Sequence, residues 1–344
     1  MHRIHFAGFQ PGKEVIPLAL ACGVGERLPA RHHVHGAFIQ RIIDEGPQLW
    51  QASPLDQANV VVYPHRHDAD TPETDHVARR AQQAGLPCLF FRHHDNSRPA
   101  SPPYGVVYRT SIFADARTSC EYGMPADADD ALLERDGQVI VRDKRSPATL
   151  GFCGSIGNPG HWLRCMAQRK FDNASGTAFR RRMVKRLRRS RKIRAQFIIR
   201  RRYWGGAVSR LHRDEPLQRR LRQEYVQNMV DSDYNLCVRG AGNFSLRFYE
   251  TLSAGRIPLF INTQCVLPFD DQINWKNHCV WVEEDQIDHA DEILADFHAS
   301  VSPERFKQMQ RANRQLWCDW LTPLSFYRRV IDQACAMRKD PASC

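Results

Sequence analysis

Short runs of apolar residues alternate with longer segments of helical spacing along most of this chain. The runs with the clearest strand character are residues 59–63, 87–91, 149–153, 234–239 and 257–261. Runs of this length and composition are typical of strands that are buried on both faces. Helical spacing is clearest at residues 75–84, 246–254, 302–317 and 324–337. The alternation predicts an α/β protein whose helices cover parallel sheets.

One strand–loop–helix–strand unit lies at the centre of this pattern, between Tyr234 and Ile261. Gly240 and Gly242 follow its first strand and allow the backbone to turn tightly. Ser245 is a favourable N-cap for the helix that follows. The free N–H groups and the dipole of a helix start attract anions, so this turn is predicted to bind phosphate.

Charged residues flank the predicted phosphate site. Arg239 ends the strand and Arg247 lies in the first helical turn, so both side chains can face the same anion. Glu250 lies too far along the helix for a capping box, which would place the acid at residue 248. Two interpretations of Glu250 stay open. It forms a surface pair with Arg247, or its carboxylate accepts two hydroxyls of a sugar.

This stretch resembles the donor-binding region of the exostosin family of glycosyltransferases. The matching residues are Arg239-Gly240, Ser245-x-Arg247-x-x-Glu250, Leu252…Gly255-x-Ile257-Pro258, Leu267-Pro268-Phe269, Ile273-x-Trp275 and Val282-Glu283-Glu284. Two weaker matches lie upstream, at Phe91-x-x-His94-Asp95 and at Leu150-Gly151-Phe152-x-Gly154.

The resemblance implies a fold of two Rossmann-like domains that face a cleft, the GT-B architecture. Residues 1–146 would form the N-terminal acceptor domain, and residues 147–322 the C-terminal domain that binds the nucleotide-sugar donor. Residues 323–344 would form a C-terminal helix that crosses back to the first domain. A length of 344 residues suits two domains.

The resemblance also implies a set of donor-binding residues: Arg239, Gly240, Gly242, Asn243, Ser245, Arg247 and Glu250. A second glycine-rich loop, opening at Gly154 and Ser155, follows the strand at 149–153 and precedes a predicted helix. That context favours phosphate binding, so these two residues join the donor set.

Catalytic candidates lie in the N-terminal half, beyond the ends of two predicted strands. His65 follows the strand at 59–63, and His94 and Asp95 follow the strand at 87–91. Ligands of such sheets bind beyond the carboxyl ends of the strands. An inverting transfer needs a base that takes the proton of the acceptor hydroxyl. Asp95 is the first candidate, and His94 and His65 are the alternatives.

Two patterns raise the question of a metal ion. Asp-x-Asp pairs occur at residues 68–70, 127–129 and 231–233, and histidines accompany aspartates at 65–68 and 93–95. Such pairs arise readily by chance, and neither histidine cluster has the spacing of a zinc motif. We therefore predict no metal site, because arginines and helix N–H groups can take the diphosphate charge.

Composition fits an ordinary globular protein, with 42% hydrophobic and 25% charged residues. The 11 cysteines form no CxxC pair, so free buried thiols are expected. No run approaches the roughly 18 apolar residues of a membrane span, and the N-terminus lacks a signal-peptide core. We expect a cytoplasmic protein, peripheral at the inner face of the membrane.

Much of the net charge of +11 lies in residues 180–202. The apolar residues of this region gather on one half of a helical wheel: Phe179, Met183, Val184, Leu187, Ile193, Phe197 and Ile198. This pattern predicts an amphipathic basic helix that binds an anionic membrane surface. The alternative is a non-enzymatic protein that binds nucleic acid as a polyanion through this segment, although no known RNA- or DNA-binding module is visible.

The resemblance thus predicts an inverting glycosyltransferase that acts in polysaccharide or glycoconjugate biosynthesis. It would move a hexose or pentose from a UDP- or GDP-sugar to a glycan or lipid-linked acceptor, and it would need no cofactor beyond this substrate. An epimerase or a sulfotransferase is disfavoured, because neither a dinucleotide fingerprint nor a P-loop is present.

Overall fold

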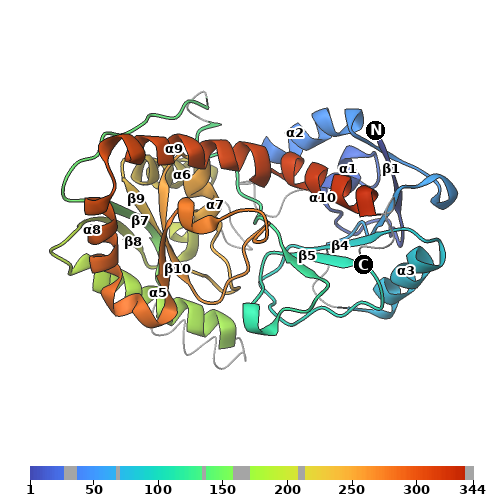
Figure 1. The fold of residues 1–344 in the computed structure, drawn as a ribbon, viewed down its shortest axis with the longest axis horizontal. Helices are drawn as coiled ribbons and strands as arrows, with labels where there is room; N and C mark the ends of the chain where they lie inside the picture. The colour runs from blue at the N-terminus through green and yellow to red at the C-terminus, as the bar shows by residue number, and fades with distance from the viewer. Residues whose placement is uncertain (27–36, 67–69, 134–136, 158–170, 208–213, 338–344) are drawn as a thin grey trace. The chain divides into compact units, whose positions relative to one another are not determined.

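The computed structural model describes residues 1–26, 37–66, 70–133, 137–157, 171–207 and 214–337 (Figure 1). Its contacts divide the chain into two compact units. Unit 1 comprises Met1–Asp129, Val266–Asp270 and Cys318–Cys344, and unit 2 comprises Asp130–Cys265 and Asp271–Trp317. Residues 130–146 therefore group with the second unit, and the segment from Cys318 onward groups with the first.

Unit 1 is built on a six-stranded sheet in which every neighbouring pair is parallel. Its strands are β1 (His2–Phe6), β2 (Trp50–Ala52), β3 (Val60–Val62), β4 (Cys88–Arg92), β5 (Val106–Arg109) and β6 (Glu121–Gly123). They lie in the order β2-β1-β3-β4-β5-β6, so the winding direction reverses between β1 and β3. In open α/β sheets, ligands bind at such a switch point.

Helices cover the sheet of unit 1. They are α1 (Pro17–Ala21), α2 (Ala37–Glu45), α3 (Pro72–Gln83) and α10 (Pro323–Met337). Val77, Ala78 and Ala81 of α3 join the buried cluster of the sheet, while α10 packs against α2 and β3. The start of α3 precedes the predicted one, because Thr71 caps the helix and Pro72 occupies its first position.

Unit 2 repeats the same winding with five parallel strands. They are β7 (Thr149–Ser155), β8 (Arg194–Arg200), β9 (Tyr234–Cys237), β10 (Ile257–Asn262) and β11 (Val280–Glu283). The order β8-β7-β9-β10-β11 places the switch point between β7 and β9. When the strands of each sheet are counted from the first, unit 2 follows the order 2-1-3-4-5, and unit 1 follows the same order with a sixth strand added at its end.

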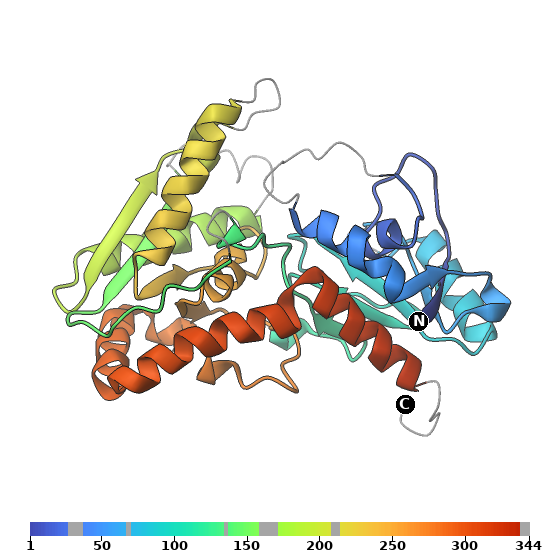
Figure 2. The same cartoon turned by 90° about the horizontal axis from the view of Figure 1, so that it is seen from above.

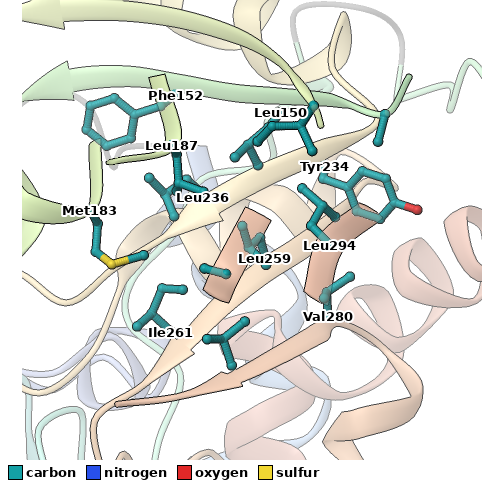
Figure 3. Close-up of a cluster of buried hydrophobic side chains, with 14 of the residues drawn as sticks. Leu150, Phe152, Met183, Leu187, Tyr234, Leu236, Leu259, Ile261, Val280 and Leu294 are labelled. Carbon is teal, nitrogen blue, oxygen red and sulfur yellow. The ribbon is translucent and has the colours of Figure 1, made fainter. Parts of the chain in front are cut away.

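The core of unit 2 lies between this sheet and its helices. The helices are α5 (Phe171–Arg188), α6 (Glu215–Val230), α7 (Leu246–Ser253), α8 (Ala290–Ser300) and α9 (Pro303–Leu316). Leu150, Leu236 and Leu259 come from three neighbouring strands and pack with Met183 and Leu187 of α5 (Figure 3). Figure 2 shows α6 and α9 as separate long helices of this unit.

The predicted amphipathic helix over 180–202 is wrong. Helix α5 ends at Arg188, and residues 194–200 form strand β8, which pairs with β7 along its whole length. Met183, Val184 and Leu187 are fully buried in the protein's own core, so they are not available to a membrane. Within the described residues, no helix has the length and apolar character needed to cross a membrane.

The predicted fold class is confirmed, since each unit is a parallel, doubly wound α/β domain of the Rossmann-like type found in GT-B proteins.

Candidate functional site

Arg247 lies at the switch point of unit 2. Its Nη2 donates to the carbonyl of Cys153 at the end of β7 (2.6 Å), and its Nη1 lies 3.4 Å from the carbonyl of Leu236 in β9. These two strands flank the reversal of the sheet. The guanidinium therefore sits where an α/β sheet of this order binds its ligand.

Two aromatic rings hold the guanidinium of Arg247. Its Cζ lies 4.4 Å from the ring centre of Phe152 and 5.3 Å from that of Tyr225. Arginine stacks well on aromatic faces because its cation is planar and weakly hydrated. The rings and the strand carbonyls fix the position of this cation in advance of any ligand.

Gly154 makes room for this arrangement. A Cβ at residue 154 would lie 2.9 Å from Nη2 of Arg247, which is closer than real Cβ contacts allow. The predicted role of Gly154 as a phosphate contact is untested, but its lack of a side chain has a definite use. It lets the cation approach the end of β7.

Glu250 is buried, with 3% of the residue exposed, and it belongs to the same cluster. Its Oε1 accepts a hydrogen bond from Nη1 of Arg222 (2.6 Å), and its Oε2 accepts one from the hydroxyl of Tyr225. The alternative of a surface pair with Arg247 is therefore wrong. Sequence analysis missed Arg222 and Tyr225, whose i, i+3 spacing on α6 was the available signal.

The loop between β9 and α7 carries the remaining predicted donor residues. Ser245 is the N-cap of α7, as predicted, and its side chain makes no capping hydrogen bond. Gly242 is buried, and the Asn243 side chain is tied to the end of β10. Its amide donates to the Thr263 carbonyl (3.0 Å), and its Oδ1 accepts from the Thr263 hydroxyl (2.6 Å). Asn243 thus serves to hold the loop.

Helix α5 joins the two loops at the switch point. Arg180 donates to the carbonyl of Ser155, the last residue of β7 (3.2 Å), and to the carbonyl of Arg239, which follows β9 (3.1 Å). Gly176 lets the helix come this close, because a Cβ there would overlap the carbonyl oxygen of Gly240 at 1.8 Å. A Cβ at Gly240 would lie 3.1 Å from Nη2 of Arg180, so this glycine also favours the close packing of helix and loop.

The outer side of α5 forms a basic groove of about 530 Å³, called the α5 groove below. Its lining comprises Ala178, Arg181, Arg182, Lys185, Arg186, Arg189 and Asp288. Asp288 pairs with Arg182 (2.8 Å), and its carbonyl accepts from Arg186. Five basic side chains against one acid leave the groove strongly positive.

In unit 1, His65 lies near the β1–β3 switch point, but both of its ring nitrogens are engaged. Nε2 accepts from the backbone N–H of Gln10 (2.7 Å), and Nδ1 lies 3.2 Å from the Glu14 carbonyl. The ring stacks on Phe9 and is 2% exposed. Burial lowers the pKa of His65. This environment is that of a structural histidine.

Asp95 and His94 are exposed, on a loop that a buried ion pair holds. Arg109 donates to the carbonyls of Asn96 (2.6 Å) and Arg98, and it pairs with Glu121. Arg109 and Glu121 are almost fully buried, at 2% and 1% exposed. The loop that carries Asp95 is therefore held in place by hydrogen bonds from the buried Arg109 side chain.

A further cluster, which sequence analysis did not find, surrounds His93. Its Nδ1 lies 3.3 Å from Oδ1 of Asp127, and its Nε2 lies 3.4 Å from the Tyr327 hydroxyl. Arg66 donates to the other oxygen of Asp127 (2.8 Å). Burial raises the pKa of Tyr327, so its hydroxyl keeps its proton. The His93-His94-Asp95 run and the Asp-x-Asp pair at 127–129 were the signals of this cluster in the sequence.

Within the described part of the chain, no group of three or more His, Cys, Asp or Glu side chains could hold a metal ion. Asp70 pairs with Arg92, and Asp233 accepts from Arg142 (2.8 Å) and from the Thr149 N–H (3.0 Å). Residues 67–69 lie outside the described residues. The described cysteines are all free thiols.

Taken together, the fold and the switch-point cluster define a two-domain Rossmann-like protein with a preformed cationic site in unit 2. Residues 162–297 match the Exostosin GT47 domain. The resemblance to the exostosin family inferred from the sequence is thereby confirmed for residues 162–297.

Individual proteins are also similar to parts of this chain. Exostosin-1 of Drosophila melanogaster is 31% identical over 96 residues, covering 28% of this chain and 12% of that protein. The "Probable beta-1,4-xylosyltransferase IRX10L" of Arabidopsis thaliana is 34% identical over 87 residues, covering 25% of this chain and 20% of that protein. The "Probable glucuronosyltransferase GUT1" of rice is 35% identical over 79 residues, covering 23% of this chain and 19% of that protein. The matches thus span a quarter or less of these relatives.

Among solved structures, MurG of Acinetobacter baumannii aligns with 98% of this chain and 99% of its own. The identity is 12% and the TM-score is 0.35.

The buried state of His65 predicts a pH effect on stability. The imidazole of the unfolded chain takes up a proton near its ordinary pKa of about 6.5, whereas burial lowers the pKa in the fold. The stabilisation is therefore fully present above about pH 6.5 and is lost as the pH falls toward the lowered pKa. His65→Gln should show a smaller loss of unfolding free energy between about pH 7.5 and pH 5.5, measured by urea denaturation.

Two other histidines, His278 and His298, provide an internal comparison for this effect. Burial also lowers the pKa of His278 and of His298, so a pH-dependent loss persists in the variant. If the unmodified protein and His65→Gln lose the same unfolding free energy over this pH range, His65 does not titrate in this way.

Proposed function

We propose that this protein is an inverting glycosyltransferase that moves a sugar from a nucleoside-diphosphate sugar, UDP- or GDP-linked, to a glycan or lipid-linked acceptor. The observation that carries the proposal is the placement of Arg247 and Glu250 together at the switch point of unit 2, within the exostosin domain. The names of the matched relatives, which include a glucuronosyltransferase and a xylosyltransferase, support it.

The donor chemistry follows from the charges of the site. As the glycosidic bond to the donor breaks, negative charge grows on the leaving diphosphate and must be stabilised. We assign this role to Arg247 and Arg239, the Ser245 hydroxyl, the N–H groups at the start of α7, and the backbone of Gly154 and Ser155. The Glu250 carboxylate would accept the hydroxyls of the ribose. No divalent cation is required in this scheme.

The acceptor would bind unit 1, and Asp95 is our candidate for the base. Its support is its position on an exposed loop that Arg109 and Glu121 hold in place. A rigidly held carboxylate at the end of a strand suits proton abstraction from an acceptor hydroxyl. His94 is the alternative on the same loop.

The competing proposal, a non-enzymatic polyanion binder, finds no support among the matched relatives. The α5 groove instead supports a narrower role, attachment to an anionic surface at the cytoplasmic face of a membrane. This attachment would be electrostatic, because the apolar side of α5 packs into the protein core.

The donor site is tested by Arg247→Ala and Glu250→Ala. A hydrogen bond to a charged group is worth roughly 1.5–3 kcal/mol, so each change should weaken UDP or GDP binding by about ten-fold to a hundred-fold. Isothermal titration calorimetry in EDTA measures this, with exposed Arg220→Ala on α6 as the control. Unchanged affinity in both variants would refute the donor site, and binding abolished by EDTA would refute the metal-free scheme.

The base is tested by Asp95→Asn, which keeps the shape of the side chain and removes the proton acceptor. The rate of sugar transfer should fall by about 10²- to 10⁴-fold while nucleotide affinity is retained. Asn96→Ala changes a neighbouring side chain and serves as a control for disturbance of the loop. Transfer within a few-fold of the unmodified rate would move the role of base to His94 or to another group.

The α5 groove is tested with vesicles of phosphatidylcholine, with and without phosphatidylglycerol. Lys185→Gln with Arg189→Gln removes two charges and leaves the Asp288 pairs intact. Each charge contributes about 1 kcal/mol near an anionic surface, so salt-sensitive binding should fall by about 30-fold. Arg219→Gln with Arg220→Gln, exposed on α6, is the matched control. The proposal would be contradicted if the two double variants lost vesicle affinity equally, or if the unmodified protein did not bind the vesicles at low salt.

A further inference from the structure

Helix α6 supplies two residues to the donor site that have no role in the scheme above. Arg222 and Tyr225 each donate to a different oxygen of the Glu250 carboxylate. A carboxylate has about four lone-pair positions, two on each oxygen. The two bonds from α6 therefore leave capacity for two more donors, which is the number that the vicinal hydroxyls of a ribose provide.

Tyr225 also contacts the second charged residue of the site. Its ring lies against the Arg247 guanidinium, 5.3 Å from ring centre to Cζ, while its hydroxyl binds Glu250. One side chain thus fixes the relative position of the carboxylate and the cation. Burial raises the pKa of Tyr225, so the phenol stays protonated and remains a donor.

Arg222 supplies the charge that the buried carboxylate needs. Its side chain is 13% exposed and that of Glu250 is 4% exposed, so the pair is shielded from water. A buried carboxylate without a partner would be strongly disfavoured, and a fixed cation removes that cost. The ring of Tyr225 also lies 5.5 Å from the Arg222 guanidinium, measured from ring centre to Cζ. Tyr225 therefore contacts Arg222, Arg247 and Glu250.

We propose that Tyr225 and Arg222 are positioning residues that orient Glu250 to accept the 2′ and 3′ hydroxyls of the donor ribose, and that they thereby set a preference for ribonucleotides. The inference rests on the proposed donor site. Neither residue is assigned a contact with the nucleotide. They act by holding the carboxylate in one orientation next to Arg247.

The test compares the affinities of UDP with 2′-deoxyUDP, and of GDP with 2′-deoxyGDP, by calorimetry. The unmodified protein should prefer the ribonucleotide by about ten-fold or more, because the deoxynucleotide lacks the 2′ hydroxyl that donates to the charged Glu250 carboxylate. Tyr225→Phe removes the donor and keeps the ring over Arg247. The preference should then fall to within about two-fold, while the affinity for the deoxynucleotide stays nearly unchanged.

Arg222→Lys serves as the second variant, because loss of all charge beside Glu250 endangers folding. It keeps the charge and loses the planar geometry, so it should give an intermediate preference. Arg220→Lys, exposed on the same helix, is the matched control and should behave as the unmodified protein.

The outcomes separate this inference from the proposed function. A ribose preference that is lost in Glu250→Gln but unchanged in Tyr225→Phe and Arg222→Lys would overturn the positioning roles and leave the donor site standing. A lower melting temperature with an unchanged preference would show that the two residues are only structural. Failure of the unmodified protein to bind either nucleotide would overturn both.

Discussion

The structure of the proposed donor site depends on how the guanidinium of Arg247 is held. The Arg247 guanidinium lies between the rings of Phe152 and Tyr225, and it bonds the backbone at the ends of the two strands that flank the switch point. A cation that is already ordered and partly desolvated binds an anion without the entropy cost of ordering a flexible side chain. Gly154 and the buried pair of Arg222 with Glu250 are consequences of this placement, because they supply the space and the charge around it.

Unit 1 uses buried charge for a different purpose. Arg109 and Glu121 form an ion pair that also bonds the backbone of the 94–101 loop, including the Ala100 N–H (2.7 Å). Glu121 further accepts from the Thr118 N–H (2.9 Å). A buried pair adds little net stability, but its hydrogen bonds fix the geometry of the groups that they join. This pair therefore keeps exposed Asp95 in a constant position. The two units share a winding order, but their buried charges lie at different places. Arg247 of unit 2 lies at the switch point, whereas Arg109 and Glu121 of unit 1 bond the 94–101 loop.

The sequence predicted most of the fold, because strands buried on both faces and capped helices leave local signals. Ser245 and Ser302 mark the starts of α7 and α9, as expected. The failure at residues 180–202 has a physical reason. A helical wheel cannot separate a helix from the strand after it, and Phe197 and Ile199 of β8 pack on the core at a spacing of two. In the site, Arg247 was predicted to face an anion from its position in the first helical turn, whereas the donor role of Glu250 was implied by the resemblance to the exostosin family. The contacts of Tyr225 and Asp127 were not predicted, because they depend on tertiary packing.

Hydrogen–deuterium exchange can show whether the switch point of unit 2 is the nucleotide site. Backbone amides that bind a diphosphate exchange more slowly, and the method locates them along the chain. With saturating UDP or GDP, we expect protection at residues 154–157 and 240–248, with little change in β8 or in α3. Protection confined to unit 1 or to the α5 groove, with residues 240–248 unchanged, would contradict it.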